Sequence, residues 1–241
     1  MRNVLVTGGS RGLGLAIAKK LVADGFRVLA LARKPTDELN AVIAAAPAGA
    51  LHFVPFDLAQ LDKIADLVRD LKAAHGPFYG LVNNAGLGTE GVLTNMSDAK
   101  IESLIRLNVL SPVMLTKAVM RSMMVTGEGR IVNMASIIGF TGYSGLSVYG
   151  ASKASMLGFT RSLAREVGRL GVTVNAVAPG FIDTEMTHEL SDAQREKIAR
   201  RSALNRMPEP IDVARSVEFL LGDGGRNITG TVITVDAGNT A

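Results

Sequence analysis

The amino-acid sequence predicts a Rossmann-like α/β fold: one doubly wound parallel sheet of about seven strands, with helices on both faces. Short apolar strands alternate with amphipathic helices along the whole chain, as in repeated βαβ units. The first predicted strand also runs directly into a glycine-rich turn that opens a helix. With 241 residues, of which 47% are hydrophobic and 20% charged, the chain is expected to form one globular domain over residues 1–241.

The predicted strands are short runs rich in β-branched and apolar residues: 3–7, 27–32, 51–55, 80–83, 129–134, 172–178 and 231–235. The predicted helices repeat apolar residues every three or four positions: 13–23, 61–74, 98–124, 148–169 and 210–221. Gly25 and Gly222 follow the first and last of these helices. Pro112 is expected to kink the third, because proline lacks a backbone donor. Strands that are joined through helices imply parallel pairing with right-handed crossovers.

The composition excludes several kinds of protein. The chain has no Cys, so it forms no disulfide and has no thiol nucleophile, and this composition suits the reducing cytoplasm. The net charge of +4 comes from interspersed Lys and Arg rather than from a basic patch, which disfavours a nucleic-acid binder. Neither a signal-peptide core nor an apolar run of the roughly 20 residues that span a membrane is expected. The protein is therefore predicted to be cytoplasmic, with no nucleic-acid or membrane partner and no metal site.

A glycine-rich turn follows the first predicted strand. Gly8, Gly12 and Gly14 permit backbone conformations and close approaches that other residues prevent, and the helix behind them offers unpaired N–H groups to an anion. A strand, a glycine turn and a helix in this order are typical of a site for the diphosphate of a dinucleotide. The spacing is TGxxxGxG rather than GxGxxG, and the alternative is a tight βα turn with no ligand.

The end of the second predicted strand indicates which dinucleotide binds. NAD sites normally carry a carboxylate there for the ribose 2′-hydroxyl, whereas NADP sites accommodate the 2′-phosphate with an arginine. Here Arg33 and Lys34 follow the strand, and Arg11 lies within the glycine turn. These cations favour NADP(H) over NAD(H), because a guanidinium pairs with a phosphate that a carboxylate would repel.

Two further strand ends complete the predicted cofactor site. Asp57 and Leu58 follow the third strand at the edge where an adenine would lie, although Asp57 is equally well interpreted as a helix N-cap. Asn84, Ala85 and Gly86 follow the fourth strand, beside the point where the strand order reverses. Their small size leaves room for a ribose and a ring to pass close to the backbone.

The residues that carry chemistry lie between Ser136 and Lys153. Tyr149 and Lys153 are four residues apart on a predicted helix and therefore share one face. A neighbouring ammonium is expected to lower the pKa of the phenol, and Ser136, at the preceding strand end, would hold a substrate oxygen against that phenol. The alternative is an ordinary helix with a half-buried tyrosine and a lysine that extends to solvent.

Together these motifs resemble the short-chain dehydrogenase/reductase family over nearly the whole chain. The resemblance rests on residues 7–14 (TGGSRGLG), 83–86 (NNAG), Asn108, Ser136, 149–153 (YGASK) and 179–180 (PG). Within the family, residues 174–187 and 228–238 most resemble the 3-oxoacyl-[acyl-carrier-protein] reductases. The resemblance implies NADPH-dependent hydride transfer to a carbonyl, with reduction of 3-oxoacyl chains in fatty acid synthesis as the implied reaction.

The resemblance also implies roles by position. Tyr149 would be the general acid in reduction, and Lys153 would lower its pKa and hold the nicotinamide ribose. Ser136 would bond the substrate oxygen, and Asn108 would order a water that links Lys153 to solvent. The alternatives are a helix or turn cap at Ser136 and a satisfied polar residue at Asn108. The implied cofactor contacts are Gly8, Gly9, Ser10, Arg11, Gly12, Leu13, Gly14, Arg33, Asp57, Leu58, Asn84, Ala85, Gly86, Tyr149, Lys153, Pro179, Gly180, Ile182 and Thr184.

Residues 183–206 are interpreted as a lid over the substrate site, which would determine the choice of substrate. The apolar residues of this region would either line a channel for an acyl chain or pack against the protein: Met186, Leu190, Ile198, Leu204 and Met207. Alternative substrates are another small ketone, a sugar or a polyol. A more distant alternative is a catalytically silent NADP-binding sensor or scaffold.

The resemblance also implies partners. Family members commonly form homotetramers in which the two long helices, here 98–124 and 148–169, pair with those of a second subunit. An acyl carrier protein is the further implied partner, and its acidic surface would meet basic residues near these helices. Residues 125–129 contain no Lys or Arg, so Arg165 and Arg169 are the candidates to take that place.

Overall fold

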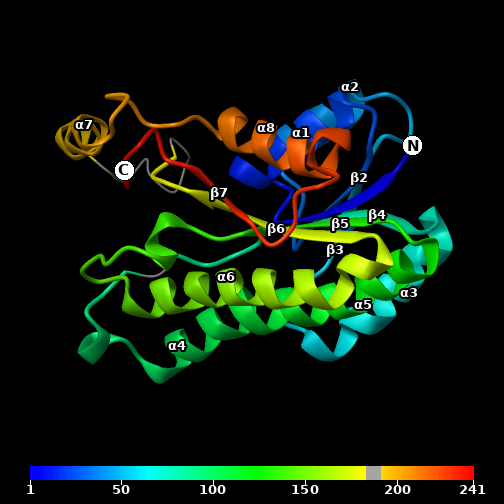
Figure 1. Ribbon diagram of the computed structural model, residues 1–241, viewed down its shortest axis with the longest axis horizontal. Helices are drawn as coiled ribbons and strands as arrows, with labels where there is room; N and C mark the ends of the chain where they lie inside the picture. The colour runs from blue at the N-terminus through cyan, green and yellow to red at the C-terminus, as the bar shows by residue number, and fades with distance from the viewer. Residues whose placement is uncertain (89, 183–190) are drawn as a thin grey trace.

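The computed structural model describes residues 1–88, 90–182 and 191–241. Figure 1 shows three layers, with one sheet between two layers of helices. The described residues form a seven-stranded parallel sheet in the order β3-β2-β1-β4-β5-β6-β7, which confirms the predicted fold class. The strands are β1 (Asn3–Thr7), β2 (Arg27–Ala32), β3 (Leu51–Pro55), β4 (Phe78–Asn83), β5 (Gly129–Met134), β6 (Val172–Pro179) and β7 (Val232–Val235).

The helices cover both faces of the sheet (Figure 1). One face carries α1 (Gly12–Ala23), α2 (Asp37–Ala45) and α8 (Pro210–Leu221). The other face carries α3 (Ile64–His75), α4 (Asp98–Ile105), α5 (Ser111–Thr126) and α6 (Ser147–Val167). The remaining helix, α7 (Asp192–Arg201), lies at one end of the molecule, near the C-terminus. Short helical turns are η1 (Leu61–Lys63), η2 (Leu93–Asn95), η3 (Arg106–Leu110), η4 (Ile137–Gly139), η5 (Gly168–Leu170) and η7 (Asp223–Gly225).

Each face of the sheet has its own hydrophobic core. Successive residues of a strand point to opposite faces, so Val4 and Val6 of β1 belong to the core under α1 and α8, whereas Leu5 belongs to the core under α3, α5 and α6. All three side chains are fully buried. Because both faces are covered, the strands are nearly continuous apolar runs, as expected for a parallel sheet.

The predicted helix 98–124 is divided into α4, the π-helical turn η3 and α5. The irregularity therefore lies just before Pro112 rather than at it. In a regular α-helix the N–H of residue 112 would donate to the carbonyl of Asn108, and proline has no such donor. The N–H of Ser111 instead donates to the carbonyl of Arg106, five residues back. This turn places Asn108 inside the protein.

The same segment corrects one sequence expectation. By length and composition alone, the run Asp98–Thr126 qualifies as a candidate membrane span among the described residues. In the structure it packs on the sheet, where Leu115, Val119 and Met123 have no exposed surface. The apolar residues on this side of α5 thus belong to the hydrophobic core between α5 and the sheet, while Leu110, Met114 and Met124 of the same run are exposed.

Helix α2 was not predicted from the sequence. Its N-cap is Thr36, whose hydroxyl oxygen accepts a hydrogen bond from the N–H of Leu39 at 3.2 Å. Asp37 and Glu38 follow in the first turn, where the helix dipole favours negative charge. Thr36 followed by two acids is the signal in the sequence that could have identified this helix.

Candidate active site

The parallel sheet brings the carboxyl ends of its strands to one edge. Thr7 of β1 and Asn83 of β4 end adjacent strands at the point where the strand order reverses. Met134 of β5 and Pro179 of β6 end the next two strands along the same edge. The turns and helices that follow these strands therefore carry the predicted site residues to one region.

The glycine turn after β1 is packed too tightly for a side chain at Gly14. A Cβ atom at Gly14 would lie 2.1 Å from the Gly8 carbonyl oxygen and 2.6 Å from Nδ2 of Asn84. Gly8 and Gly12 have φ angles of 68° and 52°, which favour glycine. The turn thus presents its backbone at the N-terminus of α1, as a diphosphate site requires.

A hydroxyl that the sequence analysis did not single out fastens this turn to the one after β4. Thr7 Oγ1 accepts hydrogen bonds from the N–H groups of Asn84 and Ala85, each at 2.9 Å, and donates to the carbonyl of Val82 at 3.3 Å. Asn84 Nδ2 donates in turn to the Thr7 carbonyl at 2.9 Å. The two predicted cofactor segments are therefore held together, and a threonine at the last position of β1 was the available signal.

Basic side chains stand where a 2′-phosphate was predicted. Arg33 and Lys34 follow β2 and are exposed, and Arg11 is the exposed N-cap residue of α1. The segment is fixed to the glycine turn because the Thr36 hydroxyl donates to the Ser10 carbonyl at 2.6 Å. The glycine turn lets a ligand approach its backbone, and the cations beside it would pair with a phosphate, so together they fit a phosphorylated dinucleotide.

The remaining predicted cofactor residues lie along the same edge. Asp57 Oδ1 accepts a hydrogen bond from the N–H of Ala59 at 3.0 Å, which closes a local turn, but the N-cap of η1 is Gln60, so the interpretation of Asp57 as a helix N-cap is wrong. Leu58 and Ile182 are buried, and the N–H of Gly180 donates to the Val235 carbonyl at 2.9 Å. Thr184, with Met186 and Leu190, lies outside the described residues.

Ser136 and Tyr149 approach each other at the end of β5. Ser136 caps η4, and its Oγ accepts a hydrogen bond from the N–H of Ile138 at 3.2 Å, which confirms the turn-cap interpretation. The Tyr149 phenol lies close enough to this hydroxyl for the hydroxyl to act to lower its pKa. Two hydroxyl groups, from the N-cap of η4 and from α6, thus lie near each other, an arrangement that can hold one oxygen atom of a ligand.

Lys153 lies on the same side of α6 as Tyr149, as predicted. Its Nζ is 5.7 Å from the centre of the Tyr149 ring and donates to the Met134 carbonyl at 2.8 Å. Lys153 is buried, with 8% of its surface exposed, and this burial lowers its pKa to about 8.

The predicted lowering of the Tyr149 pKa is wrong for this structure. Burial raises the pKa of Tyr149 and outweighs the opposing effect of the Ser136 hydroxyl. Because Tyr149 and Lys153 are both removed from water, desolvation disfavours the charged form of each, phenolate and ammonium alike. The geometry that the sequence predicted is present, but the phenol is held in its neutral, proton-donating form.

Asn108 is a satisfied polar residue, which was the alternative interpretation of it. Its Oδ1 accepts from the N–H of Leu87 at 2.8 Å, and its Nδ2 donates to the Leu87 carbonyl at 2.9 Å and to Ser152 Oγ at 3.1 Å. A Cβ at Gly86 would lie 3.2 Å from Asn108 Oδ1 and 3.6 Å from Lys153 Nζ. Asn108, Lys153 and the turn after β4 therefore meet at Gly86.

Comparison with known proteins agrees with this geometry. The short chain dehydrogenase family model matches residues 2–195. The 3-oxoacyl-[acyl-carrier-protein] reductase FabG of Escherichia coli K12 is 39% identical over 97% of this chain and 95% of its own length. Nodulation protein G of a Rhizobium species is 37% identical over 98% of this chain and 96% of its own length.

Two solved structures share the fold along almost the entire chain. A mutant short-chain dehydrogenase/reductase of Serratia marcescens superposes with a TM-score of 0.91 at 29% identity and covers 100% of this chain and 98% of its own. The structure of ElxO with NADP bound gives 0.90 at 27% identity, with coverage of 99% and 98%. The parallel sheet, the glycine turn and the convergent hydroxyl groups thus have one explanation: this chain belongs to the short-chain dehydrogenase/reductase family and is an oxidoreductase.

Proposed function

We propose that this protein reduces the 3-oxo group of acyl thioesters to a 3-hydroxyl group, with NADPH as reductant and acyl carrier protein as carrier. The observation that carries the proposal is the convergence of Ser136, Tyr149 and Lys153 beside the glycine turn. The relatives from Escherichia coli and Pseudomonas aeruginosa, at 39% and 38% identity, are named for this reaction. Reduction of another small ketone, or oxidation of a sugar or polyol, is the alternative.

The cofactor proposal rests on the cradle and the cations described above. The glycine turn, with the segment from Asn84 to Gly86, would hold the diphosphate and ribose, and Arg33 would pair with the 2′-phosphate. Support comes from the similar fold of ElxO, whose structure contains NADP. When bound, the nicotinamide supplies the hydride.

The residues of this chain would orient the carbonyl and supply the proton. The Ser136 and Tyr149 hydroxyl groups would donate to the substrate oxygen, which becomes negative as the carbonyl is reduced. The raised pKa of Tyr149 keeps its proton in place until that oxygen becomes basic enough to take it. Lys153 would steady the phenolate that remains, because its ammonium lies beneath the ring.

Asn108 would act through its position in η3. Its side chain is used by Leu87 and Ser152. We propose that Asn108 orders a water between Lys153 and solvent, because Asn108 Oδ1 and Lys153 Nζ both lie against Gly86. Asn108→Ala removes the amide together with its contacts to Leu87 and Ser152, so kcat should fall, and an unchanged kcat would contradict the assignment.

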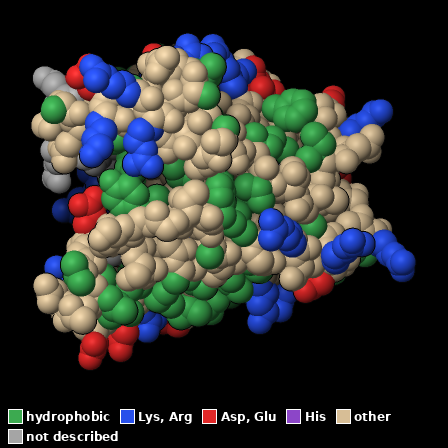
Figure 2. Space-filling view, turned by 60° about the vertical axis from the view of Figure 1, so that its left-hand side comes forward, with side chains coloured by type: hydrophobic (Ala, Val, Ile, Leu, Met, Phe, Trp, Pro, Cys, Tyr) green, Lys and Arg blue, Asp and Glu red, His purple; other side chains and the backbone are tan. Residues whose placement is uncertain are grey.

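An apolar substrate is supported by exposed apolar residues in the segments after β4, after β5 and after α7. Val92, Phe140, Tyr143 and Leu204 are each about half exposed, at 59%, 48%, 52% and 60%. Figure 2 views the molecule with the left-hand side of Figure 1 turned forward, and apolar side chains gather on the face that it shows. We infer that residues 183–206 cover this region as a lid, of which the part from Ser191 onward is described and includes α7.

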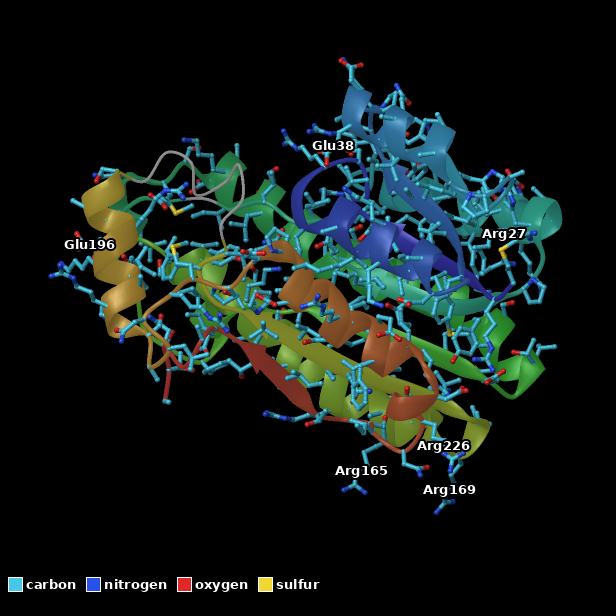
Figure 3. The ribbon with its side chains drawn as sticks, turned by 90° about the horizontal axis from the view of Figure 1, so that it is seen from above. Arg27, Glu38, Arg165, Arg169, Glu196 and Arg226 are labelled. Carbon is cyan, nitrogen blue, oxygen red and sulfur yellow. The ribbon has the colours of Figure 1, made fainter. Side chains whose placement is uncertain are left out.

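A basic surface supports the carrier-protein proposal. Arg165 and Arg169 extend outward near the C-terminus of α6, and Arg226 extends outward at the same end of the molecule (Figure 3). Such a cluster would attract an acidic carrier protein and lose part of that attraction at high salt. Glu166, the acidic residue exposed on the same helix, lies beside Arg165 and offsets part of this positive charge.

The reaction is tested by initial rates of NADPH oxidation with an acetoacetyl thioester, free and attached to acyl carrier protein, beside simple ketones, sugars and polyols. We expect the thioester to give the highest kcat/KM, with a KM for the carrier-bound form that rises with salt. Preference for a ketone or sugar would support the alternative. No turnover with any carbonyl would support a silent sensor.

The cofactor preference is tested with Arg33→Asp. The wild type is expected to bind NADPH more tightly than NADH, and the variant to lose at least about 10-fold in NADPH affinity, since one charge-assisted hydrogen bond contributes about 1.5–3 kcal/mol. The measurement is the Kd of each cofactor by fluorescence titration, with Lys34→Asp beside it. An unchanged preference in Arg33→Asp would refute the assignment of the 2′-phosphate to this residue.

Assembly and location complete the proposal. We propose a cytoplasmic homotetramer in which α5 and α6 pair with those of a second subunit. Leu110, Met114 and Met124, in and just before α5, are exposed at 45%, 39% and 41%, and the exposed face of α6 carries the small residues Ala151 and Ala154. Light scattering on the purified protein measures the mass, and a monomer would contradict the proposal.

A further inference from the structure

A fully buried hydroxyl lies between the two chemistry-bearing residues of α6. Ser152 has no exposed surface and directly precedes Lys153. Its Oγ is 2.7 Å from the Tyr149 carbonyl oxygen and 3.1 Å from Asn108 Nδ2, which lies 44 residues away in the chain. Ser152 was not among the predicted site residues, since its partner in η3 is distant in sequence.

The chemistry of these partners fixes the direction of both hydrogen bonds. A carbonyl oxygen only accepts and an amide NH₂ group only donates, so the single proton of the Ser152 hydroxyl points to the Tyr149 carbonyl. The lone pairs of Ser152 then face Asn108 Nδ2. The other side of the same amide binds both the N–H and the carbonyl of Leu87. All polar groups of this buried set are therefore satisfied in one arrangement.

This set joins three segments that meet at the proposed reaction centre. Through Asn108, Ser152 connects the helix that carries Tyr149 to the backbone of Leu87. Leu87 follows Gly86, which lies against Asn108 Oδ1 and Lys153 Nζ. The hydroxyl of Ser152 thus links α6 directly to the side chain that η3 presents to this turn.

We propose that Ser152 is a positioning residue: it fastens the turn after β4, through the Asn108 amide, to the helix that presents Tyr149 and Lys153. This inference rests on the proposed function, because Ser152 connects the turn after β4, which would contact the cofactor, to α6, which carries the proposed proton donor Tyr149. The Asn108 amide makes two hydrogen bonds to Leu87 and one to Ser152, so a shift of α6 or of the turn by one residue would break at least one of them.

The chain provides a matched control about one turn further along α6. Ser155 also carries a hydroxyl that donates to a helical carbonyl, that of Ser152, at 2.7 Å. Ser155 is half-buried, and this hydrogen bond stays within its own helix. Ser155→Ala therefore removes the same kind of intrahelical bond and leaves the cross-link to Asn108 in place.

The test compares Ser152→Ala, Ser155→Ala, Asn108→Ala and the double variant Ser152→Ala/Asn108→Ala. Loss of one net hydrogen bond contributes about 0.5–1.5 kcal/mol, so we expect kcat to fall roughly 2- to 10-fold in Ser152→Ala, with a displaced pH profile. Ser155→Ala should match the wild type. The double variant should be no slower than Asn108→Ala, because both changes break the same connection.

A second measurement, amide hydrogen exchange at Leu87, does not depend on turnover. Its N–H should exchange faster in Ser152→Ala than in Ser155→Ala or the wild type. Equal exchange in the two serine variants, or losses of kcat that add in the double variant, would overturn the proposal. If the wild type turns over no carbonyl, the proposed function fails, while the exchange result still decides whether Ser152 fastens the turn.

Discussion

Replacement of Tyr149 by phenylalanine is expected to lower kcat by roughly 10²- to 10⁴-fold, the range that a positioned proton donor contributes. The change removes one hydroxyl and keeps the ring, so the face that Lys153 contacts is preserved. Binding of NADPH should be nearly unchanged, because the cradle for the diphosphate is made by the turns after β1 and β4. Stopped-flow turnover and a fluorescence titration of NADPH measure the two effects separately.

Tyr79→Phe is the matched control for this variant. Tyr79 is also buried, but its hydroxyl donates to the Leu221 carbonyl at 2.6 Å, at the opposite end of β4 from Asn83. Its loss should cost about 1 kcal/mol of stability and leave kcat unchanged. If Tyr149→Phe retained more than about a tenth of the wild-type kcat, Tyr149 would not be the proton donor.

Replacement of Lys153 by methionine is expected to reduce kcat at least about 100-fold and, at pH 7, to increase the stability of the fold. Methionine has a similar length but no charge, and the lysine it replaces is buried. The pKa of Lys153, lowered to about 8, corresponds to a cost of about 3 kcal/mol for keeping this group charged in the folded protein. The lost hydrogen bond to the Met134 carbonyl makes this an upper bound for the gain.

The pH dependence of this gain follows from the direction of the shift. Below pH 8 the lysine is charged in both folded and unfolded protein, so the wild type bears the full cost of burial. Between about pH 8 and 10.5, the ordinary pKa of a lysine in the unfolded chain, the folded protein loses its proton first and the wild type gains stability. The stability difference between Lys153→Met and the wild type should therefore shrink over this interval.

Urea unfolding at about pH 7, 9 and 10.5 measures that difference, with the exposed Lys72 of α3 changed to methionine as control. Lys72→Met should differ little from the wild type at every pH, because its side chain is exposed rather than buried. A Lys153→Met protein that is less stable than the wild type at pH 7, with a difference constant in pH, would show that the ammonium stabilises the fold instead.

The sequence alone determined the architecture and the order of the site. Apolar runs of strand length alternating with helical periodicity are local patterns, and parallel pairing follows from joining strands through helices. The same holds for Tyr149 and Lys153, because a spacing of four residues places two side chains on one helix face wherever that helix lies. The two cations after β2 could also be identified, since their position depends only on the end of one strand.

What only the tertiary structure decided depends on contacts between distant segments. The direction of the Tyr149 pKa shift is set by burial beneath neighbouring elements, so the lysine four residues away did not determine it. The hydroxyl of Ser152 joins two segments because it bonds to Asn108, 44 residues away, and that of Thr7 does so because it bonds to Asn84, 77 residues away. Helical and strand periodicity report the geometry of a few neighbouring residues, whereas desolvation and long-range hydrogen bonds exist only after the sheet and both helical layers have assembled.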